Sequence, residues 1–384
     1  MSSAVEGYLG ALVKTEPQLE SLKELYIGKK WHQLTEEILK LINSSQGNHI
    51  NLVELYDLFV REFESNVNPL ALVRILVGIA RKNYQDLNKA LDFVEKATSS
   101  KAFISADEEA SLFLKSEMAG LKLEGGNLSG IKQILEEVGT ALESSRDLDI
   151  VVHSSYHRVC AQYYKAVGPA TKYYSSALLF FQYTPPDSFT LEERVRWAYD
   201  LGVASIVAET IFNFGEILEY DIMQSLRSEK LQWLLDLLEA FKFGSIEKFN
   251  QVSNRARDQI NQEPVLSSNW QFLERKIRLR ALMELATKKL AERVISFDDI
   301  CLNCQVTKEQ VEYLVMKALS LQLLQGTINE MNKTVSISYV QPKTLDRNEV
   351  EGLYNRLIPW KAHVHEIALS LERSTEADLA QAQN

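Results

Sequence analysis

The chain has 384 residues, of which 46% are hydrophobic and 24% are charged, a composition typical of a folded protein rather than a disordered one. Its formal net charge of −10 disfavours nucleic acid and anionic membranes as partners of the whole chain, because their phosphate groups repel it. Only 8 prolines and 16 glycines occur, too few for an all-β sandwich, which needs a turn about every ten residues. The composition therefore favours a mainly α-helical protein.

Cysteine content and the N-terminal sequence indicate the cellular compartment. Three cysteines are too few for a disulfide framework and fit a reducing environment. The first residues carry neither the basic start nor the apolar run of a signal peptide. No stretch reaches the roughly 18 apolar residues that a membrane span requires. We therefore expect the cytoplasm and the nucleus.

Residues 1–183 show the spacing of amphipathic helices joined by short turns. Asn68-Pro69 is a helix start, and Asp107 can cap a helix that ends before the turn at 125–127. Antiparallel helix pairs of this kind predict a tetratricopeptide-like α-solenoid, with an irregular helical bundle as the alternative. One apolar face, with spacings of 3, 4 and 3 residues, is formed by Trp31, Leu34, Ile38 and Leu41.

A Thr-Pro-Pro-Asp sequence at 184–187 is the strongest break in the chain and predicts a module boundary. Residues 184–295 then form a second helical module, which includes a long helix over 270–293. This helix carries a basic run, for which we expect a solvated face or a face that forms salt bridges between subunits. The run consists of Arg275, Lys276, Arg278 and Arg280.

Residues 296–341 predict a winged helix. Thr307 is placed to cap a helix, with Gln310 at capping-box spacing, and two β-like runs follow at 324–329 and 334–340. Phe297 is a candidate for a further short strand. The order of helix, turn, helix and hairpin is that of a winged-helix module. We predict that its second run is an edge strand to which a partner chain adds, through Thr334, Val335, Ser336, Ile337, Ser338 and Tyr339.

Residues 342–384 predict a last helix with a narrow apolar seam. The spacings along the seam are 3, 4, 3, 4, 3 and 4 residues, which is a heptad pattern that needs a partner helix or a bundle groove. Pro359 lies inside this helix and is expected to kink it. The predicted partner-binding seam is Val350, Leu353, Leu357, Trp360, Val364, Ile367 and Leu371.

No residue pattern predicts a catalytic, cofactor-binding or metal site. Cys301 and Cys304 lack a second ligand pair for zinc, and we expect them to pack as small apolar side chains. His153, His157 and Cys160 lie one helical turn apart, but Ser154 stands where a zinc protease needs glutamate. Carboxylates are expected on solvated helix faces. The chain is therefore predicted not to be an enzyme.

The winged helix also raises the possibility of a nucleic-acid-binding protein, in which the helix at 308–322 enters a groove. Over residues 296–341, however, three lysines stand against five acidic residues, and there is no arginine to read a guanine edge. Nucleic acid is therefore the less favoured partner, and it is kept as an alternative.

A helical array, a winged helix and a bundling helix in this order resemble the plan of the PCI family. These proteins are scaffolds shared by the proteasome lid, the signalosome and a translation initiation factor. The local sequences at 212–216 (FNFGE), 240–249 (AFKFGSIEKF) and 276–285 (KIRLRALMEL) are similar to stretches of one subunit of the proteasome regulatory particle lid. The C-terminal helix and residues 153–164 are similar to it as well.

The resemblance implies a non-catalytic structural subunit of a hetero-oligomer, without a cofactor. It implies contacts with other PCI-type lid subunits through the winged helices, and with the lid metalloprotease pair through a helical bundle. The sequence leaves open whether the N-terminal array holds a ubiquitin receptor. A scaffold of one of the sister complexes is the remaining alternative.

Overall fold

The computed structural model describes residues 20–382 apart from several short segments. These segments are residues 44–51, 85, 100–103, 105, 146, 186–187, 229–230, 290–292 and 346. The chain divides into two compact units, Met1–Thr190 and Leu191–Asn384. Their division lies close to the predicted break at 184–187, of which Pro186 and Asp187 are outside the described residues.

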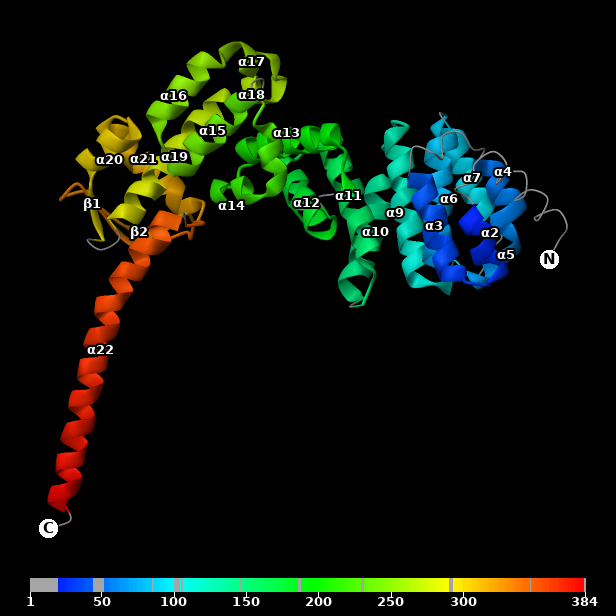
Figure 1. Cartoon of the computed structure of the whole chain (residues 1–384). Coiled ribbons are helices and arrows are strands. Elements are labelled where there is room, and N and C mark those ends of the chain that lie inside the picture. The colour runs from blue at the N-terminus through cyan, green and yellow to red at the C-terminus, as the bar shows by residue number, and fades with distance from the viewer. Residues whose placement is uncertain are drawn as a thin grey trace. The chain divides into compact units, whose positions relative to one another are not determined.

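The first unit is built from α-helices that pack against their neighbours in the chain (Figure 1). Asn68, which precedes Pro69, accepts a hydrogen bond from the Leu70 N–H at 2.9 Å, and Asp107 accepts one from the Ala110 N–H at 3.1 Å. These contacts confirm two predicted helix starts. The helices are α2 (Glu20–Ile27), α3 (Trp31–Asn43), α4 (Leu52–Leu55), α5 (Arg61–Phe63), α6 (Pro69–Asn83), α7 (Leu87–Ser99), α9 (Glu108–Glu124), α10 (Ile131–Ser144), α11 (Ile150–Val167) and α12 (Ala170–Tyr183).

The core of the first unit contains the apolar face predicted from spacing. Leu34 and Ile38 are fully buried, and Leu41 is 7% exposed. The Trp31 ring stacks on Phe63, with 5.5 Å between ring centroids and 12° between planes. Burying a side chain of this size stabilises the fold by roughly 1.5–3 kcal/mol, so this face explains why α3 forms and where it packs.

The second unit is arranged around α19 (Trp270–Lys288), which is buried along most of its length. This helix ends at Lys288, earlier than the predicted residue 293. Gly244 follows α15 and has a φ of 62°, and a Cβ added to it would lie 3.0 Å from the Arg280 carbonyl oxygen on α19. Glycine therefore permits the close approach of α15 to α19. The other helices are α13 (Leu191–Val207), α14 (Phe214–Glu219), α15 (Gln232–Phe243), α16 (Ile246–Arg255), α17 (Arg257–Gln262) and α18 (Pro264–Ser268).

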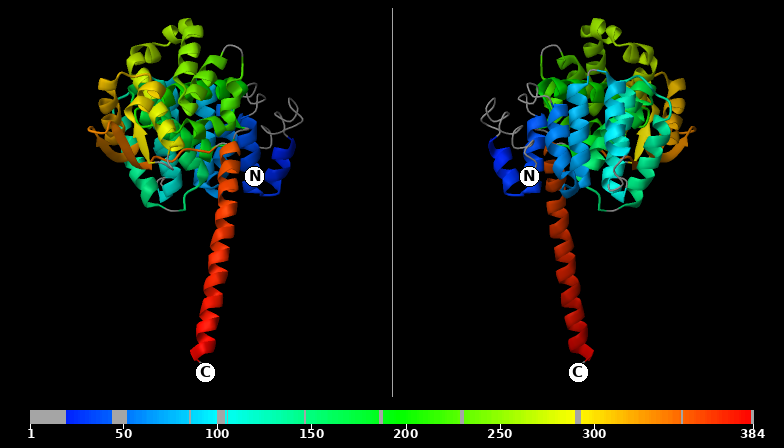
Figure 2. Two further views of the ribbon diagram at one scale, coloured as in Figure 1. Left: turned by 90° about the vertical axis from the view of Figure 1, so that its left-hand side faces the viewer. Right: turned by 90° about the vertical axis from the view of Figure 1, so that its right-hand side faces the viewer.

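A small antiparallel sheet and two short helices follow α19 (Figure 2). Thr307 and Gln310 form the predicted capping box at the start of α21. The helix–helix–hairpin order is that of the predicted winged helix. Its elements are β1 (Val294–Ser296), α20 (Phe297–Cys304), α21 (Lys308–Ser320), β2 (Leu324–Asn329) and β3 (Thr334–Val340).

The last helix, α22 (Arg347–Ala382), has 36 residues and continues through Pro359. Figures 1 and 2 show it as one continuous helix. The described chain is thus mainly α, with a small antiparallel sheet and a long C-terminal helix, as predicted. Within it, no helix combines the length and the apolar character that crossing a membrane requires.

Candidate partner-binding surfaces and buried charged centres

The predicted seam on α22 lies at the surface. Its seven residues have exposed fractions from 44% for Val364 to 65% for Trp360. Apolar side chains at heptad spacing that stay in contact with water are typical of a surface that awaits a partner helix. The exposure agrees with a binding surface, and the partner itself stays a prediction.

The segment between β3 and α22 is tied to the body of the second unit. Lys343 Nζ lies 3.0 Å from a Glu284 carboxylate oxygen, and the Thr344 N–H and hydroxyl donate to Asn213 Oδ1 at 3.2 and 3.1 Å. A Cβ added to Gly215 would lie 1.8 Å from Thr344 Oγ1, so only glycine fits there. These contacts anchor the base of the seam helix.

The predicted edge strand is a central strand, and this prediction is wrong. The strand order is β1–β3–β2, so β3 pairs with β1 over residues 334–336 and with β2 along its whole length. Sequence reasoning missed β1 because three residues are too few for an alternating pattern. Phe297, the candidate for a short strand, is the first residue of α20, directly after β1. The alternation is otherwise confirmed for Val335 and Ile337, which are buried, whereas Tyr339 is 44% exposed.

In the described part of the chain, the free edges of the sheet therefore belong to β1 and β2. The β1 edge is short: β1 pairs with β3 over three residues, and the Ile337 N–H donates to the Arg293 carbonyl just before β1. The β2 edge contains an irregularity between Gln325 and Gly326. Partner strands thus have two places to add, both different from the predicted one.

The basic run on α19 is only partly solvated, which corrects the expectation for this helix. Lys276 and Arg280 are buried, with exposed fractions of 1% and 3%. Arg280 donates to the Lys242 carbonyl at 2.7 Å, at the end of α15. Lys276 donates to three carbonyl oxygens at the end of α13, those of Ser205, Ile206 and Ala208, at 2.8, 2.9 and 2.5 Å. Helix ends expose carbonyls without internal partners, and these side chains satisfy them.

Three aromatic rings surround the Lys276 amine. Its nitrogen lies 5.5 Å from the Phe212 ring centroid, 5.1 Å from that of Phe214 and 5.9 Å from that of Phe272. Burial lowers the pKa of Lys276 to about 7. The rings and the three carbonyl oxygens favour the ammonium form, since an ammonium has three N–H donors.

This buried centre joins the three local sequences that carry the family resemblance. Phe212 and Phe214 come from the first, Lys242 from the second, and Lys276 and Arg280 from the third. The Phe214 ring also packs against that of Phe241, with 5.1 Å between centroids. Three segments far apart in the sequence therefore meet in one packing centre.

The first unit contains a second buried charge that sequence reasoning missed. Glu117, expected on a solvated face, is 4% exposed. Its carboxylate oxygens lie 2.7 Å from Arg81 Nη2 and 2.7 and 2.8 Å from Arg158 Nη2, and one accepts from Ser155 Oγ at 2.6 Å. Although burial raises the pKa of Glu117, the two arginines and the hydrogen bonds outweigh it and hold that pKa below its ordinary value. No signal in the local sequence separates Glu117 from exposed glutamates.

The histidine and cysteine groups are packing residues in the structure. The rings of His153 and His157 stack on Tyr183, with centroid distances of 5.1 and 5.6 Å. Burial raises the pKa of Cys160 to about 11 and that of Cys304 to about 12, so both stay thiols at neutral pH. Within the described residues, no group of three histidine, cysteine or acidic side chains is placed to hold a metal ion.

We expect His157 to make the stability of the first unit depend on pH. Burial, with a smaller contribution from His153, lowers its pKa from 6.5 to about 4. The unfolded chain therefore binds more protons between these pH values, so stability is present above pH 6.5 and is lost as pH falls towards 4. Since His157 is only partly buried, we expect a loss of about 1 kcal/mol. His157→Phe should reduce the change of the thermal midpoint with pH between pH 4 and 6.5. If the midpoint of the variant depends on pH as steeply as that of the wild type, His157 is not the group responsible.

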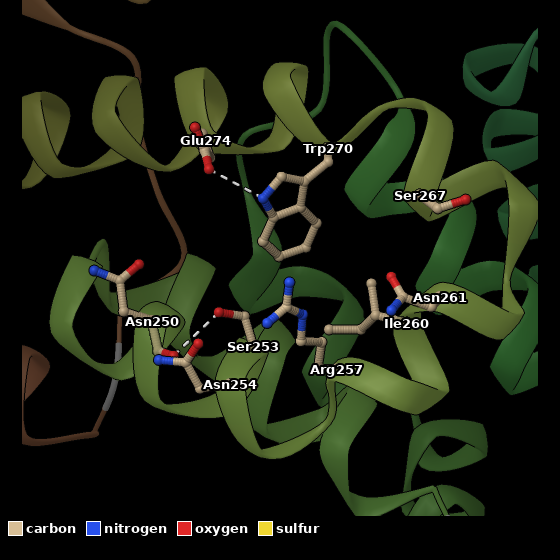
Figure 3. Close-up of a pocket in the computed structure, with 9 residues that line it drawn as sticks. All are labelled: Asn250, Ser253, Asn254, Arg257, Ile260, Asn261, Ser267, Trp270 and Glu274. Carbon is tan, nitrogen blue, oxygen red and sulfur yellow. Dashed lines mark hydrogen bonds between the residues drawn. The ribbon is translucent and has the colours of Figure 1, made fainter.

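A polar pocket of about 450 Å³ lies between α16, α17 and the start of α19 (Figure 3). Trp270 forms one wall, and its indole N–H donates to Glu274 at 3.0 Å. Arg257 and three asparagines line the other side. The pocket contains both signs of charge, and its side chains alone do not indicate a ligand.

Two family models match the chain. One, described as PSD13 N-terminal repeats, matches residues 18–238, and the other, described as the PCI domain, matches residues 243–338. Together with the helical repeats and the winged-helix sheet, they define the class of the protein: a PCI-domain protein with N-terminal helical repeats.

Similarity over the full length narrows this class. The chain is 32% identical over 362 residues to the 26S proteasome non-ATPase regulatory subunit 13 of Dictyostelium discoideum, covering 92% of this chain and 93% of that protein. It is 29% identical over 368 residues to the 26S proteasome regulatory subunit RPN9 of Saccharomyces cerevisiae, covering 93% and 92%. The chain belongs to the family of 26S proteasome non-ATPase regulatory subunit 13.

A more distant match lies outside this family. The chain is 23% identical over 158 residues to the eukaryotic translation initiation factor 3 subunit M of Phaeosphaeria nodorum, covering 41% of this chain and 35% of that protein. This match covers less than half of either chain.

Proposed function

We propose that this chain is a non-catalytic structural subunit of the 26S proteasome regulatory particle lid, where it scaffolds assembly of the complex that degrades ubiquitinated proteins. The observation that carries the proposal is similarity to regulatory subunits of the proteasome over more than nine-tenths of both chains. The fold agrees with this role, since two units of packed helices present surfaces for partners rather than a reaction centre.

The seam on α22 is the proposed contact with a shared helical bundle, which includes the lid metalloprotease pair. Its exposed apolar residues and the anchored segment before it support this role. The free edges of β1 and β2 are the proposed contacts with neighbouring PCI-type lid subunits. A ubiquitin receptor on the helical repeats, and residence in the cytoplasm and the nucleus, follow as further proposals from membership in this complex.

The alternatives have weaker support. Two of the three lysines of the winged helix are paired with acids, Lys308 with Asp298 at 2.7 Å and Lys333 with Glu330 at 3.5 Å, which reduces their attraction for phosphate. The similarity to a translation initiation factor subunit covers less than half of the chain. These observations support neither a nucleic-acid-binding role nor membership in a sister complex.

Mass spectrometry of what co-purifies with the tagged, endogenously expressed chain, separated by native size, tests the proposal. We expect lid and base subunits of the proteasome in stoichiometric amounts in one large complex. Recovery of the chain as a monomer, or with signalosome or initiation factor subunits instead, would overturn the proposal.

A further inference from the structure

A small pocket lies between α19 and α21, separate from the seam and from the sheet edges. Three of its residues are cations, Arg275 and Arg278 from α19 and Lys317 from α21. Its lining includes no acidic residue, and its apolar walls are formed by Leu279, Val306, Tyr313 and Leu314. Leu279 and Leu314 are buried at its base, whereas Tyr313 is 65% exposed.

The charge of this pocket contrasts with its surroundings. The whole chain carries −10, and elsewhere on the winged helix Lys308 and Lys333 are neutralised by nearby acids. In the described structure, no carboxylate lies within ion-pair distance of Arg275, Arg278 or Lys317. An array of cations without counterions, beside exposed apolar surface, is complementary to a ligand that is both acidic and apolar.

The size of the pocket indicates what enters it. Its volume of about 180 Å³ is below the roughly 300–1,000 Å³ typical of small-molecule sites. A single large side chain of another protein fits this space better than a cofactor does. Met316, which is 61% exposed on the same helix, extends the apolar surface beyond the pocket.

We propose that this pocket binds an acidic segment of a partner protein. One apolar or aromatic side chain of the segment inserts between α19 and α21, and the flanking carboxylates pair with Arg275, Arg278 and Lys317. Duplex nucleic acid is the competing occupant, and the apolar side chains that wall the pocket disfavour it, because a phosphate backbone has no apolar group to insert between them. The proposal adds a third partner surface and does not depend on the assignment to the proteasome.

The test uses the purified full-length chain and a short fluorescein-labelled peptide, with one phenylalanine flanked by aspartates and glutamates. Fluorescence anisotropy should show binding that weakens as salt is added. Replacing the phenylalanine by serine, or the acids by lysines, should weaken or abolish binding. Failure of the acidic phenylalanine peptide to bind at low salt would overturn the proposal, as would tighter binding of a short DNA duplex that competes with the peptide.

Two sets of variants locate the binding. Arg278→Gln/Lys317→Gln should weaken peptide binding about tenfold, because each exposed ion pair contributes up to about 1 kcal/mol. Lys308→Gln/Lys333→Gln removes the same charge outside the pocket and should leave binding within about twofold. Tyr313→Ala should reduce the affinity to that of the serine peptide without changing the charge. Equal losses in both charge pairs would mean non-specific attraction and would overturn the proposal.

Discussion

Replacing Leu357 and Val364 by aspartate is expected to release the chain from its complex while both compact units stay folded. Leu357 is 49% exposed and Val364 44% exposed, so a carboxylate at either position remains in water in the isolated chain. In an assembled bundle the same carboxylates would have to leave water for an apolar interface, which is far more costly. The chain's share in the high-molecular-mass fraction, measured by native separation and quantitative mass spectrometry, should fall at least about tenfold.

The far face of the same helix provides a matched control. Asn355→Asp/Ala362→Asp adds the same charge at exposed positions outside the seam and should leave incorporation unchanged. Circular dichroism melts of both double variants should match the wild type for the two compact units. If the Leu357/Val364 variant co-purifies in normal amounts, the seam does not hold the chain in the complex.

Lys276→Met is expected to destabilise the second unit by about 4 kcal/mol. Methionine keeps the unbranched apolar length of lysine but donates no hydrogen bond. The carbonyls of Ser205, Ile206 and Ala208 would then lose a donor in a buried place, at about 1–3 kcal/mol for each group that stays unsatisfied. The loss should appear as a fall of about 10 °C in the thermal midpoint of this unit.

Arg275→Met is the control for that experiment, because it removes a cation from the neighbouring, exposed position of the same helix. It should change the unfolding free energy by no more than about 0.5 kcal/mol. A Lys276→Met variant as stable as the wild type would mean that water or a shifted backbone satisfies the three carbonyls, and that Lys276 does not hold α13 to α19.

Local signals predicted the helices well, because a helix start depends on a few neighbouring residues. Asn68-Pro69, Asp107 and the pair Thr307/Gln310 each lie at the predicted start and make the expected contacts. The heptad spacing of α22 likewise required nothing beyond the helix itself. Its exposure in the structure agrees with the prediction that it binds a partner.

Contacts between distant segments could not be predicted in the same way. β1 consists of three residues and exists because β3 pairs with it. Lys276 is an ordinary helical lysine in sequence, and its burial follows from the end of α13, about 70 residues earlier. Glu117 resembles any exposed glutamate until Arg81 and Arg158 are brought to it. Such sites depend on tertiary packing, which a single sequence does not display.

The exposure of α22 has a consequence for copies of the chain made in excess. A helix whose apolar side lies in water receives little stabilisation from tertiary burial, so its folding becomes coupled to the concentration of its binding partners. Unassembled copies would present seven apolar side chains on a segment that unfolds locally at low cost. Holding chaperones and proteases act on such segments, so surplus copies would be marked for removal by the same residues that we propose hold the chain in its complex. The amount of this subunit would then be matched to that of its partners through the fold itself.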